Sequence, residues 1–225
     1  MVESSIEVDY LVVGAGAVGM AFTDSLVAET EATIALVDRR DQPGGHWNDA
    51  YPFVRLHQPS LNYGLNSREL GGGVKEASGL NAGYYELASG HEVVSHYGLA
   101  MRRDFLPTGR VRFFSSCEVD GDNAITSLLS GARCSVTSGK VVDATYSQMA
   151  IPSTHTPGFE VADGLDFVPV NDLPRAAAGH SEFVVIGAGP NRVRGRHRPG
   201  ARQHPVRGLL RSRYPHPPFS ADLRR

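Results

Sequence analysis

Residues 8–40 read VDYLVVGAGAVGMAFTDSLVAETEATIALVDRR, and the fold is decided here. An apolar run at 8–13 leads into Gly14-Ala15-Gly16-Ala17-Val18-Gly19, and a second apolar run at 33–38 ends in an acid. Apolar residues at helical spacing predict a helix over 17–29 between the two runs. The order strand, G-x-G-x-x-G turn, helix and strand is typical of a dinucleotide-binding βαβ unit and predicts an α/β fold of the Rossmann type.

Each glycine of this turn has a physical role. Gly14 permits the tight turn, Gly16 lets the backbone approach a pyrophosphate, and Gly19 lets the helix lie close to the strand. The helix N-terminus presents free N–H groups and a partial positive charge, and both favour phosphate. Asp38 ends the second strand, where a carboxylate accepts a hydrogen bond from a ribose hydroxyl. The alternative is a glycine-rich loop in another kind of βαβ unit.

The composition is that of a soluble globular protein. A chain of 225 residues suits one large domain or two small ones, and 41% of the residues are hydrophobic and 20% charged. No apolar run has the length needed to span a bilayer, and the first residues lack the basic and apolar segments of a signal peptide. Cys117 and Cys134 show neither metal spacing nor a disulfide framework, which predicts a reducing, cytoplasmic location.

The middle of the chain contains a long loop, a helix and a further strand. Residues 41–60 are rich in aromatic residues, His and Pro, and ordered loops of this kind on an α/β scaffold usually serve a site. Helical spacing predicts a long helix over 84–106, which Pro107-Thr108-Gly109 ends. Residues 111–114 predict a third strand, parallel to the first two, and residues 116–122 predict a loop.

Two more elements follow. Short runs within about 123–146, separated by Ser130-Gly131 and Ser138-Gly139, predict a small antiparallel meander. An apolar run at 183–186 leads into Gly187-Ala188-Gly189, which is half of a second dinucleotide motif. Two such units in one chain suggest two nucleotides, although an apolar strand with an unrelated tight turn is the alternative.

At this point the sequence resembles the flavin-containing monooxygenases and related two-dinucleotide flavoproteins, over roughly residues 8–189. The resemblance rests on the first glycine turn, the acid after the second strand, a Gly-Gly-x-Trp segment, a Tyr-Pro…Arg…Pro-Ser run and an Asp-Ala-Thr segment. These are Gly14–Gly19, Asp38, Gly44-Gly45-His46-Trp47, Tyr51-Pro52, Arg55, Pro59-Ser60, Tyr63 and Val141–Thr145.

The resemblance implies an FAD-binding domain over 1–180 and the start of an NAD(P)H-binding domain at 181–189. It also implies a reaction in which NAD(P)H reduces the flavin and O2 oxidises a small molecule, without metal or membrane. Catalytic residues are not assigned. The cofactor-binding candidates are Gly14, Ala15, Gly16, Ala17, Val18, Gly19, Asp38, Arg39, Arg40, Gly45, His46, Trp47, His57, Val119, Ala144, Thr145, Gly187 and Gly189.

Several of these candidates have plainer interpretations. Trp47 is equally explained as a core aromatic residue. His57 is explained as a loop histidine whose hydrogen bonds are made within the protein, and Arg39 and Arg40 as two solvated side chains on the surface. Two departures from the family pattern leave oxygenation and plain flavin reduction open. Tyr146 stands where a glycine is usual, and the monooxygenase fingerprint Phe-x-Gly-x-x-x-His is absent.

The chain changes character after Gly189. The formal net charge is −2, yet residues 190–225 hold ten Arg and one acid. Pro190 removes a donor where a pyrophosphate requires one, and no amphipathic helix follows. We expect a basic tail without regular structure, best explained by a lost reading frame that truncates a longer flavoprotein. The alternative is a non-catalytic nucleotide-binding protein whose Arg-rich tail binds a polyanion, although the missing lysines argue against nucleic acid.

Overall fold

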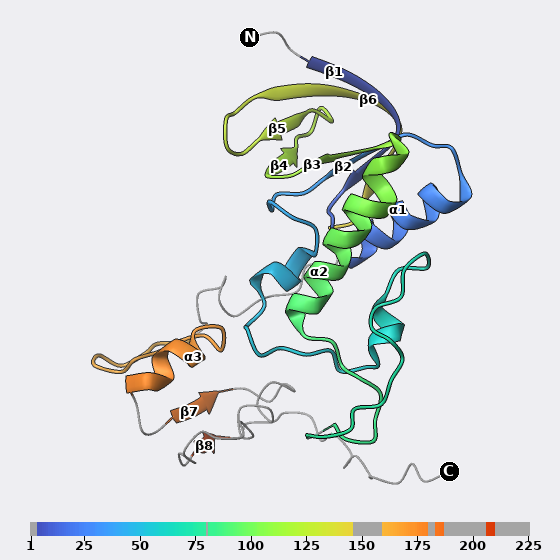
Figure 1. Cartoon of the computed structure of the whole chain (residues 1–225). Coiled ribbons are helices and arrows are strands. Elements are labelled where there is room, and N and C mark those ends of the chain that lie inside the picture. Colours follow the sequence, from blue (N-terminus) through green and yellow to red (C-terminus); the bar gives the residue numbers. More distant parts are fainter. Residues whose placement is uncertain (1–3, 80, 146–158, 180–182, 187–205, 210–225) are drawn as a thin grey trace. The chain divides into compact units, whose positions relative to one another are not determined.

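The computed structural model describes residues 4–79, 81–145, 159–179, 183–186 and 206–209 (Figure 1). The chain divides into two units, Met1–Asn171 and Asp172–Arg225, and each is described by itself.

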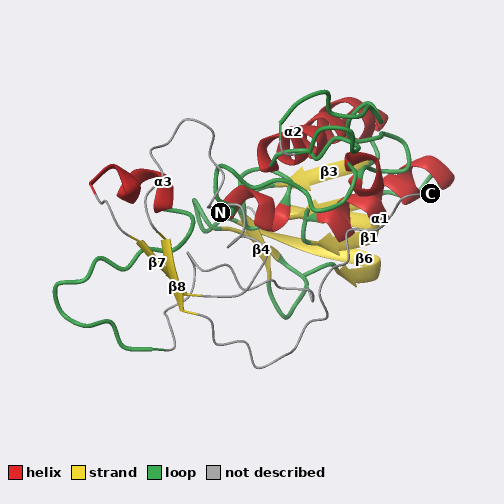
Figure 2. Cartoon of the chain, turned by 90° about the horizontal axis from the view of Figure 1, so that it is seen from below, coloured by secondary structure: helices red, strands yellow, loops and turns green. Residues whose placement is uncertain are grey.

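The first unit is built on a six-stranded mixed sheet, seen in yellow in Figure 2. Its strand order is β3-β2-β1-β6-β5-β4, in which β3, β2, β1 and β6 are parallel, and β5 is antiparallel to both β6 and β4. The strands span Ser4–Val13 (β1), Ile34–Val37 (β2), Val111–Phe114 (β3), Cys117–Val119 (β4), Ile125–Ser127 (β5) and Arg133–Asp143 (β6). The predicted α/β class and the parallel third strand are confirmed.

The β1-α1-β2 unit forms as predicted, with α1 at Ala17–Glu29. Strand β2 is buried on both faces, and so is β1 at Leu11 and Val12, which is why they read as apolar runs, whereas Asp9 earlier in β1 is exposed. Val12 and Leu36 join a core cluster that also holds Met20 of α1. Residues whose side chains lie on the opposite face of these strands, such as Leu11, join a second cluster with apolar residues of β4 and β5.

The predicted meander is wrong in one respect. Strands β4, β5 and β6 are antiparallel in turn, but Ser138-Gly139 is no turn, because β6 runs through it as one strand. This strand pairs with β1 in parallel from Cys134 to Asp143. A Cβ at Gly139 would lie 3.0 Å from the Asp9 carbonyl oxygen, so the glycine serves close strand pairing. The loop expected at 116–122 also contains a strand, β4.

The predicted helix over 84–106 begins too early. Helix α2 spans Gly90–Ala100 and starts with a capping box, in which Ser89 and Glu92 each bond the other's backbone N–H. Residues 84–89 are not helical, and isolated bridges join Tyr85 to Lys75 and Ser89 to Arg55. The helix continues as η3 (Met101–Phe105) and η4 (Leu106–Thr108) until Gly109, at φ 71°, ends it as predicted. In Figure 1, α2 (green) lies beside α1 (blue), and both pack on the first core cluster.

The long loop after β2 is ordered and holds two short 3-10 helices, η1 (Gly45–Asp49) and η2 (Ser60–Tyr63). The buried carboxylate of Asp24 on α1 accepts hydrogen bonds from the backbone N–H of Ser67, at 3.0 Å, and from its hydroxyl. This contact fastens the chain after η2 to α1, so the loop has a fixed course over the scaffold.

The second unit contains α3 (Leu173–Ala176), η6 (Ala177–Gly179), β7 (Phe183–Ile186) and β8 (Val206–Leu209). The predicted strand at 183–186 is confirmed as β7. We expected no regular structure after Gly189, but Val206–Leu209 form β8, which pairs with β7 in parallel. Gly187, Gly189 and the rest of 190–225 lie outside the described residues.

Within the part of the chain that the structure describes, no helix is both long and apolar enough to cross a membrane. The same residues contain no group of three or more His, Cys, Asp or Glu side chains arranged to hold a metal ion.

Candidate dinucleotide-binding site

The glycine turn lies at the carboxyl end of β1, and its backbone is packed too closely for side chains. Gly14 has φ 102°, and its N–H donates to the Val37 carbonyl at 2.7 Å. A Cβ at Gly19 would lie 1.8 Å from the Gly14 carbonyl oxygen, so only glycine fits there. Gly16 is the N-cap of α1 and has no side-chain cap, and no acid follows in the first turn. The helix N-terminus therefore keeps donors for an anion.

Asp38 makes contacts that the sequence did not predict. Its carboxylate is buried and accepts from the backbone N–H of Ala15 at 2.6 Å and of Arg40 at 2.8 Å. The side chain thus ties the end of β2 to the glycine turn. Each carboxylate oxygen can accept a second hydrogen bond, so a ribose hydroxyl remains a chemically suitable partner.

A second pair of glycines packs directly on this turn. The Gly44 N–H donates to the Ala15 carbonyl at 2.8 Å. Gly45 has φ 55°, and a Cβ there would lie 2.8 Å from the Gly16 Cα. Contact between two backbones therefore explains Gly45, whereas Gly44 adopts φ 130°, a conformation that favours glycine.

A third segment reaches the same edge from β6. The Ala144 N–H donates to the Val13 carbonyl at 2.9 Å. A Cβ at Gly14 would lie 3.0 Å from the methyl group of Thr145. The Thr145 hydroxyl donates to Asp143 at 2.6 Å, and this bond together with the Thr145 N–H lowers the pKa of that carboxyl. The structure thus brings together residues 14–19, 44–45 and 144–145, which we call the cradle.

Beside the cradle lies an aromatic group that we call the aromatic wall, Trp47, Tyr63 and Tyr97. The Trp47 indole N–H donates to the Tyr63 hydroxyl at 2.7 Å, and their rings meet edge to face at 5.6 Å between centroids. Tyr97 on α2 is buried, and that burial, followed by the neighbouring Tyr63, raises the pKa of its hydroxyl. Tyr97 was missed in the sequence because its helical spacing indicates only a core position.

His46 joins the cradle to the aromatic wall. Its ring centroid is 5.2 Å from that of Trp47. Burial lowers the pKa of His46, and the charge of Arg40 lowers it further, while Asp49 acts in the opposite direction. The imidazole is therefore biased toward its neutral form, as an acceptor or donor of a hydrogen bond rather than a cation.

The other candidates lie in more varied surroundings. Arg40 pairs with Asp49 of η1, its Nε 3.0 Å from the carboxylate, so it is a partly buried structural ion pair. Arg39 is 76% exposed, with its Nε 4.0 Å from the Glu118 carboxylate. Val119 packs on the second core cluster. His57 is exposed on the surface before η2. Ala17 and Val18 occupy the first turn of α1.

Comparison with known proteins agrees with this geometry. Residues 12–67 match the family described as the NAD(P)-binding Rossmann-like domain. The first unit is Rossmann-like. Its glycine turn, Asp38 and Gly44-Gly45 all fall within the matched residues.

The Rossmann-like unit also has longer relatives. Uncharacterised proteins of Mycobacterium tuberculosis and Mycobacterium bovis are 45% identical to this chain over 185 residues, which is 82% of this chain and 34% of theirs. The chain therefore spans about a third of the length of the curated relatives it matches.

Solved structures with similarity to the chain include the flavin monooxygenases that the sequence resembles. Cyclohexanone monooxygenase from Rhodococcus sp. Phi1, bound to NADP+, is 23% identical, with a TM-score of 0.44 over 67% of this chain and 29% of that one. A flavin-containing monooxygenase from Stenotrophomonas maltophilia is 16% identical, with a TM-score of 0.44 over 62% of this chain and 38% of that one.

Proposed function

We propose that the cradle binds FAD, and that the chain is the FAD-binding part of an NAD(P)H-dependent oxidoreductase of the flavin monooxygenase kind. The observation that carries this proposal is the convergence of three backbone segments on the open N-terminus of α1. A Cβ at Gly45 would lie 2.8 Å from the Gly16 Cα, and one at Gly19 would lie 1.8 Å from the Gly14 carbonyl oxygen, so the segments meet through their backbones, and the donors that they offer are backbone N–H groups. Backbone donors at a helix N-terminus suit a pyrophosphate.

The residues present fit the cofactor in the following way. Gly14–Gly19 with the first turn of α1 would hold the pyrophosphate, and the spare lone pairs of Asp38 would accept from the ribose. Ala144 and Thr145 would close the cradle from β6, with His46 and Trp47 beside it. The chemistry that a bound FAD would supply is hydride acceptance from NAD(P)H and electron transfer to O2, so the protein's part would be to bind, orient and shield.

We propose the complete reaction only for the longer proteins, because this chain corresponds to about a third of their length. Gly187 and Gly189 remain the proposed start of the NAD(P)H site, and the lost reading frame after residue 189 remains our explanation of the basic tail. Cys117 and Cys134 are both free thiols, which suits the cytoplasmic location that we propose.

Titration of the purified chain with FAD, followed by the visible flavin spectrum and by Trp47 emission, tests the assignment. Trp47 is the only tryptophan, so its quenching reports the site directly. We expect FAD to bind and ADP to compete with it, because both carry the pyrophosphate, whereas FMN with its single phosphate should compete poorly. Failure of FAD to bind, or tighter binding of NADPH at the same site, would contradict the proposal.

A further inference from the structure

The inference concerns a cavity of about 340 Å³ between η1, the segment after it and the N-terminal end of α2. Trp47 forms one wall, and Tyr51, Pro52, Val54 and Val94 supply further apolar surface. The volume falls at the lower end of the range for small-molecule sites. Nothing in the proposed function uses this space, because the proposed FAD site is the cradle on the glycine turn.

The lining of the cavity is neutral. Among the described residues, no Asp, Glu, Lys or Arg lines it, and its polar groups come from Gln42, Asn48, His91 and Ser95. Gln42, Pro52, His91 and Ser95 are exposed, so a charged ligand here would lose part of its hydration without meeting an opposite charge, which is costly. The lining therefore selects an uncharged molecule.

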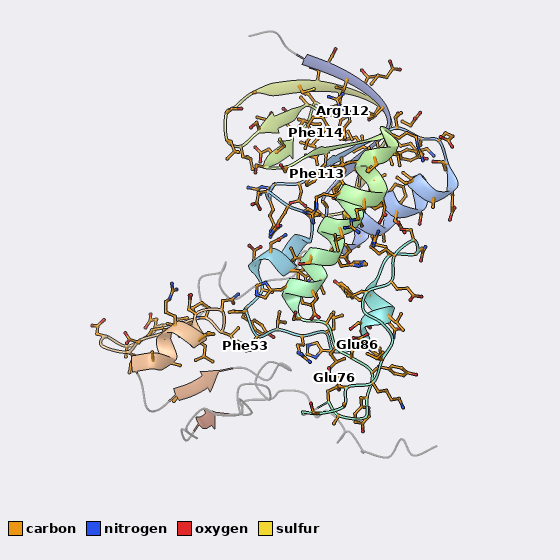
Figure 3. The ribbon with its side chains drawn as sticks, in the orientation of Figure 1. Phe53, Glu76, Glu86, Arg112, Phe113 and Phe114 are labelled. Carbon is orange, nitrogen blue, oxygen red and sulfur yellow. The ribbon has the colours of Figure 1, made fainter. Side chains whose placement is uncertain are left out.

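A neighbouring cleft of about 600 Å³ shows the contrast. It is lined by Glu69, Glu76, Glu86 and Glu92 together with Arg55 and Arg68. Arg55 pairs with Glu76 at 3.0 Å, and Arg68 pairs with Asp104, so both arginines of the cleft serve ion pairs within the fold. In Figure 3, Glu76 and Glu86 lie to one side of the N-terminal end of α2, and Phe53 lies to the other.

The neutral cavity has fixed walls and unused polar groups. The Trp47 indole is held by its bond to Tyr63, and a Cβ at Gly90 would lie 3.5 Å from its ring. The Gln42 amide N–H donates to the Asn48 oxygen at 2.9 Å, and the Asn48 amide donates to the Gly45 carbonyl at 3.1 Å. These bonds use one group of the Gln42 amide and leave its oxygen as an acceptor for a ligand.

We propose that this cavity binds a small, uncharged organic molecule that has an apolar ring and an amide, carbonyl or hydroxyl group. The ring lies against Trp47 and Val54, and the polar group meets Gln42 or Ser95. The site does not depend on a bound dinucleotide, so it can be tested with the purified chain alone.

The test uses three probes of one shape and different charge: benzamide, benzoate and benzylamine. Binding is followed by Trp47 emission and confirmed by ligand-detected NMR. We expect benzamide to bind saturably in the millimolar range, and both charged probes to bind at least about tenfold more weakly. Equal binding of all three, or no saturable binding of benzamide, overturns the proposal.

Two variants place the binding in this cavity. Ala50 lines the cavity and has an extended backbone that any residue adopts, so Ala50→Leu should fill part of the space and weaken benzamide binding at least about fivefold. Ser95→Phe, at an exposed helical position, should do the same from the α2 side. Ala77→Leu, at an exposed residue that lines neither cavity, is the control and should bind as the wild type does. Unchanged binding in both filled variants overturns the assignment.

Discussion

The cradle and the aromatic wall lie side by side but are built in different ways. The cradle depends on contacts between backbones: a Cβ at Gly19 would lie 1.8 Å from the Gly14 carbonyl oxygen, and one at Gly45 would lie 2.8 Å from the Gly16 Cα. The aromatic wall is made of side chains from three separate elements, joined by the Trp47–Tyr63 hydrogen bond and the buried Tyr97. A backbone contact cannot adjust to an added atom, whereas side chains can rotate or shift. The two regions should therefore respond very differently to the smallest possible substitutions.

The largest effect is expected for Gly19→Ala. The added methyl would lie 1.8 Å from the Gly14 carbonyl oxygen, which is backbone and cannot move aside without separating α1 from β1. We expect the free energy of unfolding to fall by more than about 3 kcal/mol, together with loss of FAD binding. Chemical denaturation measures the first and flavin titration the second.

The matched control is Gly121→Ala, because a Cβ at Gly121 meets nothing within 4 Å. Its stability should stay within about 0.5 kcal/mol of the wild type. If the two variants were equally stable, the close approach of α1 to the glycine turn would be wrong.

A smaller effect is expected for Gly45→Ala, which tests the packing of Gly44-Gly45 on the glycine turn. Alanine must adopt φ 55° there and also meet the Gly16 Cα at 2.8 Å. Gly109→Ala shares the positive φ, at 71°, but has open space around it. Both variants carry the conformational strain, so the difference in unfolding free energy between them isolates the clash, which we expect to be about 1–3 kcal/mol. No difference would mean that the Gly44-Gly45 loop does not pack on the glycine turn.

The aromatic wall should tolerate more, and Tyr63→Phe tests it. The change removes the acceptor of the Trp47 indole N–H and leaves the ring contact in place. We expect a loss of about 1 kcal/mol of stability and a shifted Trp47 emission maximum. Tyr84→Phe, at a residue 72% exposed, is the control and should change neither quantity. An unshifted emission spectrum in Tyr63→Phe would contradict the hydrogen bond.

The same contrast explains what the sequence could predict. The β1-α1-β2 unit was predicted closely, although β1 begins at Ser4 and not at the predicted Val8. The positive φ of Gly14 and the contact of Gly19 with the Gly14 carbonyl both arise within one short segment. The role of Gly45 was assigned only through resemblance, since its packing partner Gly16 is distant in the sequence. Tyr97 was not identified at all, because helical spacing does not distinguish a core tyrosine from one that supports a site.

The errors have the same physical origin. Ser138-Gly139 indicates a turn by local chemistry, but pairing with β1 keeps β6 extended through it. The start of α2 is set by the Ser89–Glu92 capping box, a local signal that the apolar spacing of 84–106 concealed. Asp38 was predicted to face a ribose alone, whereas its contact with the Ala15 N–H depends on how the turn and β2 meet.

The smallest effect concerns pH and His46, which joins the two regions. Its pKa in the folded protein is lowered, first by burial and then by Arg40, so the unfolded chain binds a proton at higher pH than the folded protein does. The free energy of unfolding should therefore fall as the pH drops below about 6.5 and stop falling below the pKa of the folded state. His96, whose pKa is also lowered by burial, contributes in the same direction.

His46→Gln should thus reduce the pH dependence of the unfolding free energy between about pH 7.5 and about pH 5.5 without abolishing it, as denaturation at several pH values would show. If His46→Gln kept the full wild-type dependence, the imidazole would not be buried between the cradle and the aromatic wall, and the two regions would be less closely joined than the structure indicates.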